Sequence, residues 1–452
     1  MKSIKRVFYA LVLVLTFVFP AASALGKTMK ETVTQAVLTN PDVQAAWHAF
    51  RAAQAEQEAA RGGYLPKVDV AVSAGWENLG GKAYRNRDQH NYFREGAYLT
   101  LSQMIYDGGM TRSQAKKFGY AKNAKYYDLL SSIEKVALLA FRSHDDVNRY
   151  REMIRLAQLN LKRHEEIMKK VEARSRAGID SSADIDIVTG RIALARVNLI
   201  TEEGNLHDAS TQYFRTVGVM PDETLQPGEL AAFSLPETPE EALRLGLEAS
   251  PRKNSVLQSV QSTYFAFEEQ RAKMRPRIDI RAGVNIENDT DGTDGRKDKS
   301  MVELVLRYNV FDGGTNEATA RRLLSLYEQS KAILEKTERE VGQALLVAYN
   351  DVHSLEKQLE PLEQHWKSSE ATERAYRQQF EVGRRSLLDL LDAQNEAFQA
   401  KRAYVNARFG YIGAKASFLH ESGALTSLFG ITRDDVPTAK ELGIKPVLET
   451  PK

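Results

Sequence analysis

Prolines are missing from two long stretches of this sequence. None of the 13 prolines lies between Pro66 and Pro221, and Pro361 is the only one between Pro276 and Pro437. Proline breaks helix interiors and is excluded from central strands, so each stretch has room for very long regular elements. A compact enzyme would need turns in these stretches, and the pattern therefore argues against one.

The chain contains two copies of one unit. Three segments of the first half recur in the same order in the second half, displaced by 205 or 210 residues. The matched pairs are 64–70 with 274–280, 105–109 with 310–314, and 177–184 with 382–389. Collinear matches of this kind indicate a duplication, and each copy is far longer than the usual repeat of a solenoid protein.

The N-terminus has the pattern of a secretory signal peptide. Basic Lys2, Lys5 and Arg6 precede an apolar segment at 7–19, and residues 22–24 (Ala-Ser-Ala) supply a cleavage site. The apolar segment is shorter than the ~20 residues that a membrane-spanning helix needs. We expect a signal peptide at 1–24, a first repeat at 25–220, a linker at 221–240, a second repeat at 241–425 and an irregular tail at 426–452.

Each repeat contains two segments in which apolar and polar residues alternate. In the first segment, Val68, Val70 and Val72 alternate with Lys67 and Asp69. Strict alternation over ~10 residues is typical of transmembrane β-strands, although a soluble sheet with one solvated face would show it too. Strands are predicted at about 67–76, 93–105, 277–287 and 300–311.

Helices fill most of the remainder. The spans at about 110–176 and 315–382 are each long enough for a helix of ~100 Å. In the second span, Val341, Leu345 and Ala348 begin a run of apolar residues with alternating spacings of four and three, which indicates a coiled-coil seam. A helix of this length cannot be packed inside a globule.

The four predicted strands are too few for a membrane barrel made by one chain. The smallest outer-membrane barrels have about eight strands, and open strand edges have no hydrogen-bond partners in lipid. Several copies must therefore contribute strands, and three copies give a 12-stranded barrel wide enough for a lumen. The predicted fold is an α+β membrane protein in which a duplicated unit of long coiled-coil helices and four transmembrane strands per chain forms a trimer.

Composition and motifs exclude several functions. Lys and Arg number 62 and Asp and Glu 60, and the resulting net charge of +2 argues against a nucleic-acid partner. The absence of cysteine excludes disulfides, thiolate metal sites and a lipid anchor on cysteine. Residues 289–300 lack the third ligand and the final Glu of a calcium loop, and Gly80-Gly81-Lys82 fails as a phosphate loop. With no catalytic motif either, we expect no enzyme activity, no cofactor and no metal.

Two segments give the sequence its strongest family resemblance. They are Leu-Ser-Gln-Met-Ile-Tyr-Asp-Gly-Gly at 101–109 and Glu-Val-Gly-Arg-Arg-Ser-Leu-Leu-Asp-Leu-Leu-Asp-Ala at 381–393. With the duplication, they make the chain resemble the TolC family of outer-membrane efflux and secretion channels, from about Asn40 to Leu425. The resemblance implies a homotrimer, with a 12-stranded β-barrel in outer-membrane lipid and an α-helical barrel in the periplasm. It also implies export of protein or small-molecule cargo, together with a periplasmic membrane-fusion adaptor and an inner-membrane ABC or other export transporter.

The same resemblance assigns residues to a periplasmic gate. Asp184 and Arg385 align with gate residues of the family, and Asp389 and Asp392 align with an acidic ring at the pore entrance. Phe380 stands at a gate position where many members carry tyrosine, so it cannot form a hydroxyl hydrogen bond to Asp184. The gate is therefore expected to depend more on an Arg385–Asp184 contact, or to be looser.

Helix capping is an alternative role for two of these acids. Ser181-x-x-Asp184 and Ser386-x-x-Asp389 both have the pattern of a capping box, in which Asp is favoured near a helix N-terminus. Asp392 lies past the cap and has no such explanation.

An alternative for the whole chain is a periplasmic coiled-coil adaptor or structural protein without its own pore. Adaptors of that kind carry one helical hairpin between small β-domains, and they lack a duplicated chain with four alternating strands. The missing lipid-anchor cysteine favours type I protein secretion over drug efflux, and the cargo stays open at this stage.

Overall fold

The computed structural model describes residues 26–78, 91–178, 181–228, 230, 233–290 and 293–444. The predicted signal peptide and Gly80-Gly81-Lys82 lie outside these ranges, as does Asp291 of the rejected calcium loop.

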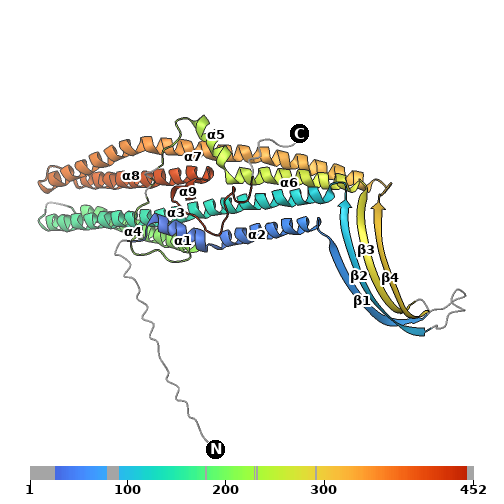
Figure 1. The fold of residues 1–452 in the computed structure, drawn as a ribbon. Coiled ribbons are helices and arrows are strands. Elements are labelled where there is room, and N and C mark those ends of the chain that lie inside the picture. The colour runs from blue at the N-terminus through green and yellow to red at the C-terminus, as the bar shows by residue number, and fades with distance from the viewer. Residues whose placement is uncertain are drawn as a thin grey trace, which may run out of the picture.

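The molecule is elongated, with a bundle of parallel and antiparallel helices at one end and a curved sheet at the other (Figure 1). The elements in chain order are α1 (Met29–Thr39), α2 (Pro41–Gly62), β1 (Lys67–Asn78), β2 (Asn91–Tyr106), α3 (Met110–Arg176), α4 (Ser182–Val217), α5 (Pro239–Ala249), α6 (Pro251–Lys273), β3 (Arg277–Thr290), β4 (Thr293–Arg307), α7 (Thr315–Glu381), α8 (Leu387–Glu421) and α9 (Leu425–Leu428). The fold class predicted from the sequence, a duplicated unit of long helices with four strands, is confirmed.

The four strands form one antiparallel sheet in the order β1-β2-β3-β4. Val68 pairs with Leu101, Leu101 with Ala282, and Ala282 with Val302, so one apolar row crosses all four strands. The two residues at the ends of this row are exposed, Val68 by 57% and Val302 by 78%. One face of the sheet is therefore apolar and uncovered within a single chain.

The opposite face of the sheet is polar. The Asp279 carboxylate is nearly buried and lies 3.0 Å from both Arg277 and Arg307. The Tyr98 hydroxyl on β2 donates a hydrogen bond of 2.9 Å to Glu287 on β3. Alternation along each strand thus separates an apolar face from a face that carries paired charges.

The last strand differs from its predicted span. The sequence placed it at about 300–311, whereas β4 runs from Thr293 to Arg307. Beyond β4, the backbone N–H of Phe311 donates to the Asn309 side chain at 3.1 Å, which turns the chain. The Asp312 carboxylate then accepts from the N–H groups of Gly314 and Asn316 at 3.1 and 2.9 Å and sets the start of α7. The prediction of strand beyond Arg307 was wrong because the ladder ends at the Arg277–Arg307 pair, where β3 begins directly after Pro276, which has no N–H to donate.

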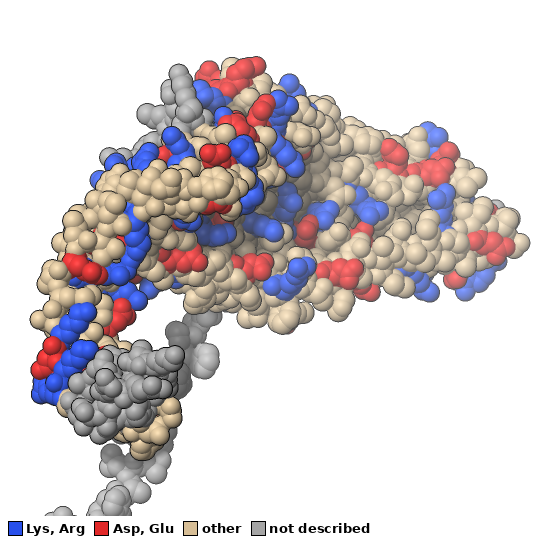
Figure 2. All heavy atoms as spheres, turned by 90° about the vertical axis from the view of Figure 1, so that its right-hand side faces the viewer, with Lys and Arg blue, Asp and Glu red and all other residues tan. Residues whose placement is uncertain are grey.

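Two helices of 67 residues each, α3 and α7, form the long axis of the molecule. α3 packs along α4 and α6, and α7 packs along α8 and α6 (Figure 1). Lysine, arginine and acidic side chains are interspersed on the face that Figure 2 shows, which agrees with the near-zero net charge. No helix in the described ranges is both long enough and apolar enough to cross a membrane.

The described part of the C-terminal tail, up to residue 444, packs against the helical bundle. The sequence predicted an irregular tail at 426–452. Leu425–Leu428 form the short helix α9, residues 429–444 have no helix or strand, and apolar residues among them pack against the main core. The buried carboxylate of Glu134 on α3 accepts hydrogen bonds from the backbone N–H groups of Leu425 and Thr426 at 3.2 and 3.1 Å. This contact fixes the start of the tail on the helical bundle.

Candidate functional site

Two helical hairpins end side by side at the end of the molecule farthest from the sheet (Figure 1). The first turn joins α3 to α4 and contains Gly178, and the second joins α7 to α8 and contains Gly383. The backbone φ angles of these glycines are +75° and +73°, in a region that residues other than glycine rarely adopt. Each repeat therefore has a glycine of the same backbone conformation just after its long helix.

Asp184 and Asp389 both cap the helix that follows the turn. The Ser181 hydroxyl accepts from the N–H of Asp184 at 3.3 Å, and the Asp184 carboxylate accepts from the N–H of Ser181 at 3.0 Å. In the second hairpin, the corresponding distances between Ser386 and Asp389 are 3.1 and 3.4 Å. Hydrogen bonding to the Ser386 hydroxyl, with help from the backbone and Arg385, lowers the pKa of Asp389. Both carboxylates therefore stabilise the start of a helix. If either also acts at a gate, it does so in addition to this structural role.

Arg385 contacts groups of its own hairpin. Its guanidinium lies 3.7 Å from the Asp389 carboxylate, donates to the Gln379 side chain at 3.1 Å, and sits 4.2 Å from the centre of the Tyr376 ring. Within the described part of one chain, Arg385 forms no ion pair with Asp184. The sequence-based contact between these two residues stays a prediction for neighbouring copies.

Phe380 is buried rather than displayed at an opening. It is 2% exposed and belongs to a small core between the two hairpins, here called the tip cluster. The tip cluster consists of Ile167, Val171, Val188, Phe380, Leu387, Leu390 and Leu391. Arg174 covers the Phe380 ring at 4.8 Å and donates to the Phe380 carbonyl at 3.1 Å. Phe380 therefore joins the end of α7 to α3.

Asp392 forms an ion pair with a residue that the sequence did not single out. Its carboxylate lies 3.1 Å from the guanidinium of Arg191 on α4, and its side chain is 70% exposed. Arg191 also faces the buried His164, whose pKa falls to about 4, chiefly through burial and further through the charge of Arg191. At the predicted ring position, the Asp392 carboxylate is thus paired with the Arg191 guanidinium.

The structure brings all five predicted residues to one end of the molecule, where Arg385 contacts Asp389 and the other three have partners outside the set. Sequence reasoning missed Arg191, Arg174 and the ion pair between Lys170 and Glu381 that links α3 to α7. One signal was available for Arg191, because it lies seven residues after Asp184 and hence two turns along the same helix face. The described residues contain no cluster of three or more His, Asp or Glu side chains placed to hold a metal ion.

Comparison with known proteins decides the family. The profile of a family described as outer membrane efflux protein matches residues 32–219 and 254–417, which is most of the chain. The chain belongs to the outer membrane efflux protein family. This membership confirms the resemblance seen in the sequence and places the protein in the outer membrane, with a large helical part in the periplasm.

Relatives in the outer membrane efflux protein family match along nearly their whole length. The chain is 21% identical to the outer membrane efflux protein BepC of Brucella suis, over 94% of this chain and 92% of that protein. It is 22% identical to the proteases secretion protein PrtF of Dickeya chrysanthemi, over 93% of each chain. Neither name describes an enzyme.

The same fold occurs in a solved outer-membrane channel. The crystal structure of the CmeC outer membrane channel of Campylobacter jejuni has a TM-score of 0.79 to this chain, at 14% identity. The match covers 88% of this chain and 86% of that one.

Proposed function

We propose that three copies of this chain form an export duct that crosses the outer membrane and the periplasm and closes at the hairpin tips. The family membership supports an export role, and the sheet supports the assembly. In this proposal the strands line the outer-membrane section and the long helices line the periplasmic section.

The observation that carries the proposal is a sheet with one uncovered apolar face and two open edges. β1 and β4 each have one neighbour in the sheet, so the outer edge of each is unpaired within one chain. Val70 and Leu304 on these edge strands are 72% and 68% exposed. An apolar face suits lipid, but free backbone N–H and C=O groups do not, because the bilayer offers them no partner.

Joining several copies satisfies both requirements. Adjacent strands of the sheet are antiparallel, so β4 of one copy can pair antiparallel with β1 of the next. Two copies would give a barrel of about eight strands filled by its own side chains, whereas three leave a lumen. The polar face with Asp279 and its two arginines then faces that lumen.

The hairpin tips supply the proposed gate. Asp184, Arg385 and the buried Phe380 lie at the two turns, and Asp389 and Asp392 follow in the first turns of α8. In a trimer, the two acids of α8 recur around the axis and form the predicted acidic ring. The Arg191–Asp392 pair moderates the negative charge of that ring.

Export through such a duct requires partners in the inner membrane. We propose a periplasmic membrane-fusion adaptor and an ABC or other export transporter, in line with the resemblance of the sequence. The name of PrtF assigns that relative to protease secretion and the name of BepC to efflux, so both cargo classes occur among relatives. The absence of cysteine, and hence of an acylated anchor, favours protein secretion for this chain.

Planar-bilayer recording combined with mass determination tests the proposal. The full chain, purified in detergent, should have the mass of a trimer by native mass spectrometry and should add discrete conductance steps to a bilayer. An adaptor or structural protein without a pore would give no steps. A monomeric mass, or the absence of conductance from a verified trimer, would overturn the proposed duct.

A further inference from the structure

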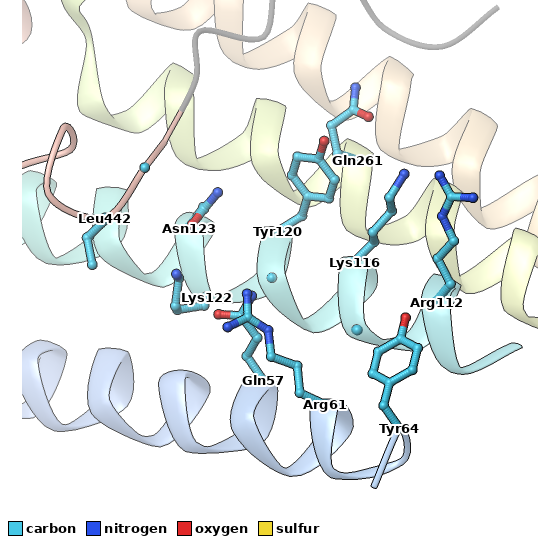
Figure 3. Close-up of a pocket in the computed structure, with 13 residues that line it drawn as sticks. Gln57, Arg61, Tyr64, Arg112, Lys116, Tyr120, Lys122, Asn123, Gln261 and Leu442 are labelled. Atoms are coloured by element: carbon cyan, nitrogen blue, oxygen red, sulfur yellow. The ribbon is translucent and has the colours of Figure 1, made fainter. Parts of the chain in front are cut away.

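A pocket of about 780 Å³ lies where the helical bundle meets the sheet. It opens between α2 and α3, and Gln261 of α6 and Leu442 of the tail complete its wall (Figure 3). Gly119 is one of its lining residues, and a Cβ added there would approach the Gln57 amide to 2.8 Å. The pocket is remote from the hairpin tips and plays no part in the proposed gate.

The lining of this pocket is strongly basic. It contains Arg61 from α2 and Arg112, Lys116 and Lys122 from α3, and its described residues include no Asp or Glu. Neighbouring lysines of α3 outside the lining are paired, Lys117 with Glu269 at 2.7 Å and Lys125 with Asp128 at 3.0 Å. In the described chain, by contrast, none of the four lining cations forms an ion pair with a carboxylate. The pocket therefore concentrates positive charge in an otherwise balanced protein.

The side chains of the pocket offer donors over an extended surface. In Figure 3, Arg61 and Gln57 reach from α2 toward α3, and Arg112 and Lys116 project from α3. Lys122 has a lowered pKa, mainly because it is partly buried and further because Arg61 repels its charge. The neutral polar side chains of the lining are Gln57, Tyr64, Tyr120, Asn123 and Gln261. All of them can donate hydrogen bonds to an anion.

The pocket begins at the edge of the membrane section. Tyr64 precedes β1 by a few residues, and Arg112 follows β2 closely. Exposed aromatic side chains mark this level of the molecule, with Tyr106 46%, Tyr308 55% and Phe311 84% exposed. Aromatic residues of this kind gather where a membrane meets water. In the proposed duct, on which this step rests, the near end of the pocket would lie at the depth of lipid headgroups.

The size of the basic surface indicates more than one anionic group in the ligand. Arg112 and Lys122 are ten positions apart on α3, which corresponds to about 15 Å along the helix. A single phosphate cannot contact both ends, whereas two linked phosphates can contact cations at several levels. Basic pockets beside a membrane are also the sites where proteins hold the headgroups of anionic lipids.

We propose that this pocket binds an anion that carries two or more phosphate groups. Two sources have this chemistry, the headgroup of a diphosphate lipid entering from the membrane and a soluble polyphosphate entering from the periplasm. Bound phosphate would neutralise the repulsion between Arg61 and Lys122 and so stabilise the junction of α2 and α3.

Ligand titrations of the full-length protein in detergent test the proposal. Native mass spectrometry measures binding of cardiolipin, with phosphatidylcholine as the neutral lipid, and calorimetry at fixed ionic strength measures binding of inorganic pyrophosphate. The double substitution Arg61→Gln with Lys122→Gln removes two lining cations. Lys125→Gln is the matched control, because Lys125 lies one turn away on α3, outside the pocket and paired with Asp128.

We expect the wild type to bind cardiolipin, pyrophosphate or both. The double variant should bind at least about tenfold more weakly, because each substitution removes a charged hydrogen-bond donor to the ligand. Binding of cardiolipin alone assigns the lipid source, and binding of pyrophosphate assigns the soluble one. The Lys125→Gln protein should bind as the wild type does. Binding of neither ligand to the wild type, or equal binding by the double variant and the control, would overturn the proposal.

Thermal unfolding without ligand separates binding from folding. Because the substitutions relieve repulsion between like charges, the double variant should melt no lower than the wild type. If it melts lower, Arg112→Gln at the other end of the pocket provides the second test, and unchanged binding by that variant would also count against the site.

Discussion

Arg191 on α4 and Asp392 on α8 form an ion pair of 3.1 Å that connects the two halves of the duplicated chain. Water reaches both side chains, which are 33% and 70% exposed, so the pair contributes only about 0–1 kcal/mol to stability. Its electrostatic effect at the proposed pore entrance is more important, because the guanidinium offsets the charge of the ring carboxylate at close range.

Arg191→Gln should therefore make the proposed channel more selective for cations, and Asp392→Asn should make it less so. Reversal potentials in a salt gradient across a planar bilayer measure both shifts. Arg196→Gln is the matched control, since Arg196 lies on the same helix and pairs with Glu165 at 3.8 Å. Equal reversal potentials for the Arg191 and Arg196 variants would place Arg191 outside the pore.

Arg385→Ser tests the proposed gate. If Arg385 holds the closed tips through Asp184 of a neighbouring copy, its removal should raise single-channel conductance, and adding Asp184→Asn should raise it no further. If Arg385 instead acts only through Asp389, 3.7 Å away in its own chain, adding Asp389→Asn to Arg385→Ser should leave the conductance unchanged, and adding Asp184→Asn should change it. Conductance equal to wild type for Arg385→Ser would remove the residue from the gate.

Phe380→Ala should loosen the hairpin tips. Phe380 is 2% exposed in the tip cluster, and removing a buried phenyl ring typically costs about 3–5 kcal/mol. Hydrogen exchange of backbone amides at 370–390 should accelerate relative to the wild type. Leu388→Ala serves as the comparison, because Leu388 is on the same turn and 52% exposed. If both substitutions give the same exchange rates, Phe380 does not hold the tip together.

Asp145 should make the protein less stable as the pH rises. Its carboxyl is buried on α3, where burial and the neighbouring charge of Asp146 raise its pKa to about 7, although Arg149 and Arg408 act in the opposite direction. Between about pH 4 and 7 the unfolded chain has lost a proton that the folded chain keeps, so stability falls through this range and levels off above it.

Asp145→Asn removes this cost and should raise stability at pH 8 by roughly 2–4 kcal/mol, with little change near pH 4. Melting temperatures between pH 4 and 8 measure the difference, and Asp351→Asn on the exposed face of α7 is the control. A constant difference between wild type and Asp145→Asn across this range would show that Asp145 does not titrate there.

Leu304→Arg should impair the membrane section. Leu304 pairs with Ile280 on the apolar face, and an arginine on the lipid side costs about 2–4 kcal/mol near the bilayer centre. Met301→Arg is the control, because Met301 lies on the opposite face of the same strand, three residues away. Fewer assembled trimers on gels for Leu304→Arg alone would support the register, and the reverse result would invert the two faces.

Patterns that are local in the sequence predicted most of the fold. Alternation at Val68 and Val70 and the absence of proline after Pro66 depend on properties of successive residues, so strands and long helices could be recognised. The end of β4 could not, because it depends on the register of β4 against β3, whose first residue, Arg277, pairs with Arg307.

Contacts between distant segments were less accessible to sequence reasoning. The resemblance placed Phe380 at the gate, but only three-dimensional packing shows that Arg174, more than 200 residues away, covers it. The same is true of Arg191 and Asp392, which lie in different repeats. The capping roles of Asp184 and Asp389, by contrast, follow from a serine three residues earlier in each case.

The unpaired edges of β1 and β4 have a genetic consequence. In the proposed trimer every copy pairs its β1 and β4 edges with its two neighbours. One copy whose edge strand cannot pair would therefore leave the barrel open. A cell that makes normal and edge-defective chains together would therefore lose most of its ducts, and mutations of these two strands should be dominant over the normal allele.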